Sequence, residues 1–169
     1  MLAACRELLV PGSGVAPAAG GGPAPEFKRI LIVRTDKLGD VILSTPVFQA
    51  LRQAYPGAFI ALLVRPYARA LVEYNPFIDE IIAYDKAGIG RSWRKTLAFV
   101  LALRQRRFDL AVVLHPSVRN HLVTFLAGIP RRIGYSGKWS FLLTEVLKTS
   151  THLGAKHEVE YNLDIVRRL

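Results

Sequence analysis

The 169-residue sequence contains a single cysteine, and this scarcity excludes several classes of protein. Cys5 alone cannot form an internal disulfide framework or a metal site built on several cysteines. Long apolar runs are also missing, because stretches such as Leu97 to Leu103 are far shorter than the ~20 residues that cross a bilayer. The opening Leu2 to Cys5 lacks the charged start and apolar core of a signal peptide. These absences predict a cytoplasmic, soluble protein.

Two common phosphate-binding motifs are absent, and acidic residues are few. No G-x-x-x-x-G-K-[ST] loop occurs, and no G-x-G-x-x-G follows a predicted strand and opens a helix. The 23 Lys and Arg outnumber the 13 Asp and Glu, which gives a formal net charge of +10. This excess favours an anionic partner such as a nucleic acid, a phosphorylated small molecule or a membrane surface, although a basic surface can also serve solubility alone.

The composition of the chain changes near residue 27. Residues 1–27 are rich in Ala, Gly and Pro, which predicts a flexible extension, because such a segment cannot bury enough apolar surface to offset its ordering entropy. Residues 28–169 are long enough for one domain with its own core. Apolar and polar patterns there predict strands at 30–33, 58–64, 79–84, 109–114 and 132–135, with helices near 40–55, 67–74, 92–106, 120–128 and 157–169.

Strands that alternate with helices at this spacing indicate βαβ units. We therefore predict an α/β protein with a Rossmann-like, doubly wound parallel sheet. Two local points stay open in the sequence. Pro46 either delays or bends the first helix, and residues 141–147 suit a helix or an extended segment.

The stretch from Arg34 to Asp40 is the best candidate for chemistry, because ligands of open α/β sheets bind beyond the carboxyl ends of strands. Gly39 permits a tight backbone, and the helix that follows offers unpaired N–H groups to an anion. Asp36 and Asp40 are both placed to act as a general base toward a substrate hydroxyl. Asp40 equally suits a helix cap, which is the commoner use of Asp at a helix start.

Basic residues follow four predicted strands at this same edge of the sheet. Arginine binds phosphate and carboxylate groups in a bidentate manner, so the convergence predicts an anion-binding cleft. The groups are Arg34 with Lys37, Arg65 with Arg69, Arg91 with Arg94 and Lys95, and Arg119. The cluster around Trp93 also suits a solvated helix start, although cations there oppose the helix dipole.

Histidines are the remaining candidates. His115 follows the fourth predicted strand and is either a ligand contact or a buried, hydrogen-bonded residue. His157 is expected to help start the last helix. No histidine pair has a cysteine partner or shares a convincing helix face, so the sequence predicts no metal site.

The segment from Lys28 to Pro56 closely resembles the amino-terminal signature of family 9 glycosyltransferases, the ADP-heptose:lipopolysaccharide heptosyltransferases. Its most specific part is the G-D-x₅-P element formed by Gly39, Asp40 and Pro46. The resemblance covers about Lys28 to Leu169. It continues through Val64-Arg-Pro-Tyr67, Asn75-Pro-Phe-Ile-Asp79, Asp109-Leu-Ala-Val-Val-Leu-His115, Arg132-Ile-Gly-Tyr135 and His157-Glu-Val-Glu-Tyr-Asn-Leu-Asp164.

This resemblance implies the acceptor-holding, amino-terminal domain of a GT-B fold, at residues 28–169. The implied reaction is inverting and independent of metal or cofactor, and it moves heptose from ADP-heptose to the Kdo-lipid A inner core of lipopolysaccharide. Asp40 matches the family's catalytic base. The residues predicted to bind the anionic acceptor are Arg34, Thr35, Lys37, Gly39, Arg65, Arg91, Arg94, Lys95, His115 and Arg119.

In the family, the helix after His157 leads into a domain that binds the nucleotide sugar, whereas this sequence stops at Leu169. The resemblance therefore implies an incomplete enzyme, with the donor ADP-heptose on a missing domain that a second polypeptide would supply. The chain is expected at the cytoplasmic surface of the inner membrane, as a peripheral protein that binds no nucleic acid. The alternatives are a basic anion- or nucleic-acid-binding module without catalysis, and a degenerate domain that recruits a partner.

Overall fold

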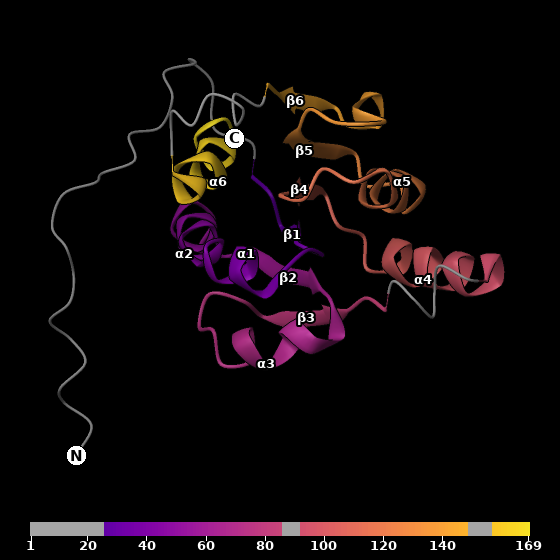
Figure 1. Ribbon diagram of the computed structural model, residues 1–169, viewed down its shortest axis with the longest axis horizontal. Coiled ribbons are helices and arrows are strands. Elements are labelled where there is room, and N and C mark those ends of the chain that lie inside the picture. The colour runs from indigo at the N-terminus through magenta and orange to yellow at the C-terminus, as the bar shows by residue number, and fades with distance from the viewer. Residues whose placement is uncertain (1–25, 86–91, 149–156) are drawn as a thin grey trace, which may run out of the picture.

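The computed structural model describes residues 26–85, 92–148 and 157–169, and its centre is a parallel sheet of six strands (Figure 1). The spatial order is β3-β2-β1-β4-β5-β6, so the winding direction reverses between β1 and β4. Ligands of such sheets bind at this switch point. The strands are β1 Arg29–Val33, β2 Phe59–Val64, β3 Glu80–Ala83, β4 Leu110–Val113, β5 Arg131–Tyr135 and β6 Glu145–Leu147.

Helices cover both faces of the sheet. Figure 1 shows α2 and α6 on one face and α4 and α5 on the other. The helical segments are α1 Leu38–Ile42, α2 Thr45–Ala54, η1 Pro66–Ala68, α3 Arg69–Val72, α4 Trp93–Gln105, α5 Val118–Leu126, η3 Ser140–Leu142 and α6 Glu158–Arg167. This arrangement confirms the predicted Rossmann-like class. Within the described ranges, no helix is long and apolar enough to cross a membrane.

The central strand β1 divides the core into two apolar clusters. Ile30 and Ile32 pack into the cluster that holds residues of α2 and α6, whereas Leu31 and Val33 pack into the cluster that holds residues of α4 and α5. All four side chains are fully buried. Burying an aliphatic side chain stabilises the fold by about 1.5–3 kcal/mol, which explains the continuous apolar run in a strand covered on both faces.

The first predicted helix consists of two helices, because α1 ends at Ile42 and α2 starts at Thr45. Pro46 lies in the first turn of α2, where its missing N–H breaks no helical hydrogen bond. The helix that contains Pro46 therefore starts late, but the separate short helix α1 before it was not predicted. Residues 141–147 contain the end of η3 and the extended strand β6. Phe27, at the end of the predicted extension, already belongs to the core and packs against Tyr55. Residues 1–25 of that extension lie outside the described part.

Candidate active site at the carboxyl edge of the sheet

Arg34 is the hub of the polar residues at the switch point, and its side chain is only 3% exposed. It follows β1, and its Nη1 donates to the carbonyl oxygen of Leu114 at 3.1 Å and to Oδ1 of Asn162 at 3.4 Å. Its Nε lies 3.0 Å from Asp36 Oδ1, and its Nη2 donates to Glu158 Oε1 at 3.1 Å. Arg34 therefore ties the end of β1 to β4 and α6. Its guanidinium is occupied within the protein, which favours a positioning role over the acceptor contact that we predicted.

Asp40 is the more open of the two carboxylates in the loop that follows β1. It is the third residue of α1, its side chain is 32% exposed, and its Oδ1 lies 3.8 Å from Nη2 of Arg34. The capping interpretation is wrong, because Lys37 occupies the N-cap position and no side chain caps α1. A carboxylate in the first turn is still favoured by the helix dipole. Asp40 is thus held loosely by one cation and faces solvent, as a general base toward an incoming hydroxyl must.

Asp36 is the neighbouring carboxylate, and its surroundings differ. Its Oδ2 lies 3.1 Å from His115 Nδ1, and its side chain is 13% exposed. Burial alone would raise the pKa of Asp36, but the hydrogen bond with His115 and the charge of Arg34 outweigh it and hold that pKa below its usual value. A carboxylate held in its ionised form is a weaker base. The structure therefore separates Asp36 from Asp40, which the sequence offered as equals.

His115 is hydrogen-bonded, as one of the two sequence interpretations stated, but its ring is partly exposed, at 29%. The end of β2 reaches the same loop through Tyr67, whose hydroxyl donates to the carbonyl oxygen of Asp36 at 2.8 Å. Arg65 Nη1 donates to that hydroxyl at 3.3 Å, and the guanidinium lies 5.7 Å from the Tyr67 ring. Sequence reasoning missed Tyr67 as a site residue. Its one signal was its place in the matched stretch Val64 to Tyr67.

Two buried amides complete the site, and sequence reasoning missed both. Asn120 accepts a hydrogen bond from Thr35 Oγ1 at 3.0 Å and donates to the carbonyl oxygen of His115 at 2.9 Å. Asn162 accepts from Arg34. Thr35 and both amides are at most 2% exposed, so Thr35 braces the loop and is out of reach of a ligand in this structure. The available signal was a polar amide on the inner face of an amphipathic helix.

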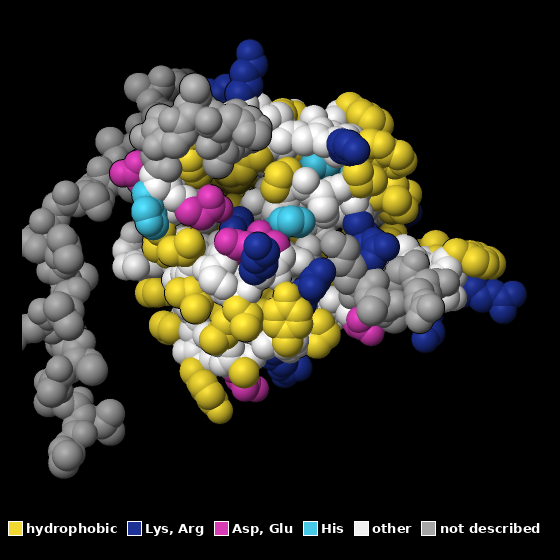
Figure 2. Space-filling model, viewed as in Figure 1, with side chains coloured by type: hydrophobic (Ala, Val, Ile, Leu, Met, Phe, Trp, Pro, Cys, Tyr) yellow, Lys and Arg dark blue, Asp and Glu magenta, His cyan; other side chains and the backbone are white. Residues whose placement is uncertain are grey.

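The other predicted acceptor residues are distributed along the edge. Lys37 and Gly39 are exposed beside Asp40. A Cβ added to Gly39 would meet no atom within 4 Å and its φ is not left-handed, so the tight geometry we expected is not required there. Figure 2 shows acidic, basic and histidine side chains gathered in the middle of the face seen in Figure 1.

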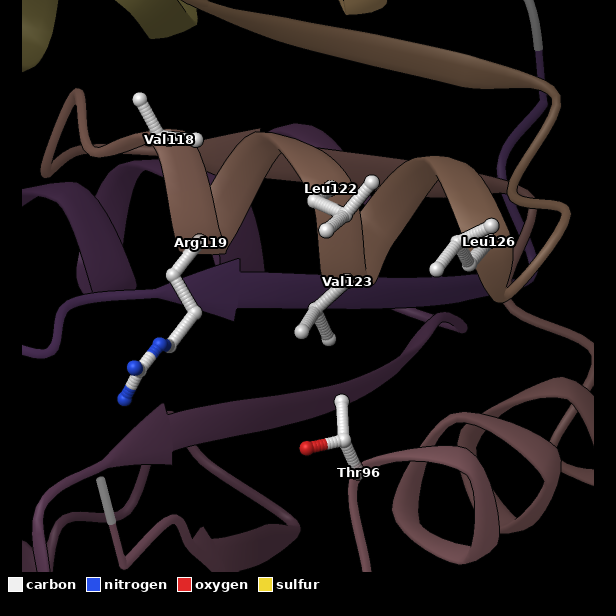
Figure 3. Close-up of a pocket in the computed structure, with 6 residues that line it drawn as sticks. All are labelled: Thr96, Val118, Arg119, Leu122, Val123 and Leu126. Atoms are coloured by element: carbon white, nitrogen blue, oxygen red, sulfur yellow. The ribbon is translucent and has the colours of Figure 1, made fainter. Parts of the chain in front are cut away.

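The cations after β3 lie on a different part of the surface. Arg94 and Lys95 are exposed on α4, and the guanidinium of Arg94 lies 5.5 Å from the ring of Trp93. Arg119 lies near Tyr84, where its charge partly offsets the rise that burial causes in the pKa of that hydroxyl, and it lines a groove between α4 and α5 (Figure 3). Arg91 lies outside the described residues. The predicted basic edge is therefore a mixed cluster around Arg34, with its cations spread toward α4.

Fold and site together define a class: a Rossmann-like α/β domain with the partly exposed carboxylate of Asp40 at the carboxyl edge of its central strand. Comparison with known proteins agrees with this class. A putative glycosyltransferase of Haemophilus influenzae is 30% identical over 142 residues, which is 83% of this chain and 40% of the relative. Lipopolysaccharide heptosyltransferase 2 of Escherichia coli is 32% identical over 123 residues, which is 70% of this chain and 34% of the relative.

A solved structure gives the same result. The family 9 glycosyl transferase of Veillonella parvula superposes with a TM-score of 0.75 at 26% identity, over 84% of this chain and 41% of that chain. No protein-family model matches the sequence. The chain is a homologue of heptosyltransferases and family 9 glycosyltransferases, which confirms the family that the sequence resembles. It spans about 40% of the length of the relatives it matches.

Proposed function

We propose that this chain is the acceptor-binding part of a heptosyltransferase-type glycosyltransferase that acts in lipopolysaccharide biosynthesis, with Asp40 as its general base. The observation that carries the proposal is the geometry of Asp40. Its carboxylate lies at the switch point of the sheet, partly exposed and 3.8 Å from one buried guanidinium. The homology to glycosyltransferases supports the reaction class.

The reaction that we propose is a single inverting displacement. The Asp40 carboxylate takes the proton of the acceptor hydroxyl while the hydroxyl oxygen attacks the anomeric carbon of ADP-heptose. The bond from that carbon to the ADP oxygen breaks, and ADP leaves with the electron pair. Arg34 holds Asp40 in place through the ion pair at 3.8 Å, whereas Asp36 stays ionised beside His115 and keeps Arg34 oriented.

The acceptor that we propose is the Kdo-lipid A inner core, which carries carboxylate and phosphate groups. Lys37 lies in the same loop as Asp40, and Arg65 reaches that loop through Tyr67 at the end of β2; Lys37 is exposed and Arg65 is partly exposed. We propose that ADP-heptose binds the part of these enzymes that the matched segments do not include, since the segments cover 34–41% of the relatives described above. No resident cofactor or metal ion enters this scheme.

The test uses a chimaera in which this chain replaces the matching segment of the Escherichia coli heptosyltransferase. With ADP-heptose and Kdo-lipid A, we expect Asp40→Asn to lower kcat by about 10²–10⁴-fold, the usual contribution of general-base catalysis, while KM for the acceptor changes little. Asp164→Asn is the matched control, because that carboxylate forms a surface pair with Arg167 on α6. Near wild-type turnover in Asp40→Asn would contradict the base assignment.

Acceptor binding is measured separately on the 169-residue chain itself. We expect Kdo-lipid A in detergent micelles to bind the chain, and a Lys37→Gln, Arg65→Gln variant to bind it more weakly, because an exposed and a partly exposed cation near the site are lost. Single-stranded DNA at moderate salt is the comparison ligand. Tighter binding to DNA than to Kdo-lipid A would favour the nucleic-acid module over the proposed function.

A further inference from the structure

Helix α4 leaves much of its apolar surface uncovered. Of its 13 residues, Val100 and Leu103 are buried. Trp93 is 72% exposed, Leu97 48% and Leu101 47%. Figure 1 shows α4 at the outer edge of the helical layer, and in Figure 2 hydrophobic and basic side chains appear together there. A stripe of large apolar side chains therefore faces solvent.

These three side chains share one side of the helix. They are spaced four residues apart, and residues at i and i+4 lie on the same face. Among the described residues, the core contacts of α4 are made by Val100, Leu103 and the partly buried Phe99, so the exposed row is not part of that packing. Contiguous exposed apolar surface of this kind marks a site of interaction.

Charge gives the second, independent indication. Arg94, Lys95 and Arg104 are exposed on α4, and Arg107 follows it. Residues 92–108 contain no Asp or Glu. The exposed part of α4 therefore combines large apolar side chains with charges that are all positive.

We propose that the exposed face of α4, made of Trp93, Leu97, Leu101 and the flanking cations, docks on anionic lipid headgroups at a membrane surface. A helix of 13 residues is about 20 Å long, too short to cross a bilayer, but it can lie in the interface with its apolar side chains immersed. Tryptophan prefers that interface, and each nearby Lys or Arg adds attraction to an anionic leaflet.

The position of α4 fits such docking. The helix follows β3, so Trp93 at its first turn lies toward the carboxyl edge that carries Asp40. A membrane beneath α4 would then lie on the side of the molecule where a lipid-linked acceptor is needed. The inference stands on α4 alone and does not depend on the role of Asp40.

Charge also distinguishes this occupant from a second copy of the chain. Two copies that met through this face would bring their arginines and lysines together without an acidic partner, which is unfavourable. The exposed side chains of α3 provide a contrast. Leu71 and Tyr74 are 48% and 91% exposed, but Glu73 lies between them and pairs with Arg69.

The test is co-sedimentation of the full 169-residue chain with phosphatidylglycerol/phosphatidylcholine vesicles and with phosphatidylcholine vesicles. We expect binding to the anionic vesicles that weakens as salt is added. Trp93→Ser, Leu97→Ser, Leu101→Ser should reduce the partition coefficient at least about tenfold. Arg94→Gln, Lys95→Gln should reduce it about tenfold to thirtyfold. The matched control, Leu71→Ser, Tyr74→Ser, should bind like the wild type.

A spectroscopic readout places the contact. With Trp139→Phe, Trp93 is the remaining tryptophan, and its emission should shift to shorter wavelength when anionic vesicles are added. The proposal is overturned if the chain does not bind, if the α4 variants bind like the wild type, or if the α3 control loses binding equally. It is also overturned if the wild-type chain is a dimer and the Trp93→Ser, Leu97→Ser, Leu101→Ser variant is a monomer. The vesicles contain no Kdo-lipid A, so none of these results bears on Asp40.

Discussion

The Arg34 cluster and the exposed face of α4 use the same kind of residue in opposite ways. Arg34 is 3% exposed and contacts three carboxylates and a backbone carbonyl, whereas Arg94 is exposed and contacts the ring of the adjacent Trp93. A buried charge must be partnered, because its desolvation costs several kcal/mol, and an exposed charge need not be. Burial therefore decides whether an arginine organises the fold or remains available to a ligand.

Removing the guanidinium of Arg34 should give the largest difference between the two regions. Arg34→Met leaves the largely buried Asp36 without its cation, and we expect a loss of about 3–5 kcal/mol in the free energy of unfolding. Arg94→Gln, the exposed counterpart, should change that free energy by less than about 0.5 kcal/mol. Urea denaturation of both variants measures the contrast. A loss in Arg34→Met as small as that in Arg94→Gln would show that Arg34 is not a structural hub.

Leucines within α4 give a second comparison on one helix. Leu103 is 1% exposed and packs in the core, and Leu101 is 47% exposed. We expect Leu103→Ala to cost about 2–5 kcal/mol, because it leaves a cavity. Leu101→Ala should cost less than about 0.5 kcal/mol. Thermal unfolding of the two variants checks this, and a large loss in Leu101→Ala would mean that the proposed lipid-facing stripe packs against the protein.

The smallest effect concerns pH. The pKa of Asp36 is lower in the folded chain than its usual value of 3.8, because His115 and Arg34 favour the carboxylate more than burial opposes it. Asp36 therefore stabilises the fold above pH ~4, and this contribution is lost as pH falls through its depressed pKa. Denaturation midpoints between pH 2 and 6 should fall less steeply in Asp36→Asn. An unchanged slope would show that Asp36 does not contribute.

Local patterns predicted most of the fold. The apolar run from Ile30 to Val33 and its later counterparts specify buried strands, and turn residues and polar loops separate them. A helix start close to Pro46 could be predicted, because proline is tolerated in the first turn of a helix and not in its interior. The bounds of β6 could not be predicted, because Glu145 to Leu147 carry no strong strand pattern and become a strand by pairing with β5.

The candidate site was predictable in location and much less so in detail. Asp40 stood out in the opening loop, but spacing alone also favoured the cap that the structure excludes. The distinction from Asp36 rests on His115, which lies 79 residues away along the chain. The contact between Thr35 and Asn120 joins residues 85 apart. Such pairs follow from which strand ends meet, and no local pattern records that.

By itself, the sequence determined the order of strands and helices, the positive charge and the loop that carries Asp40, because these follow from residue type and short-range spacing. The tertiary structure alone decided which charges are buried against partners and which face solvent. It placed Arg34 among Asp36, Asp40 and Glu158, and it left the apolar stripe of α4 uncovered. The reason is physical: exposure and pairing depend on which distant segments pack together, and they set the pKa, reach and partner of each side chain.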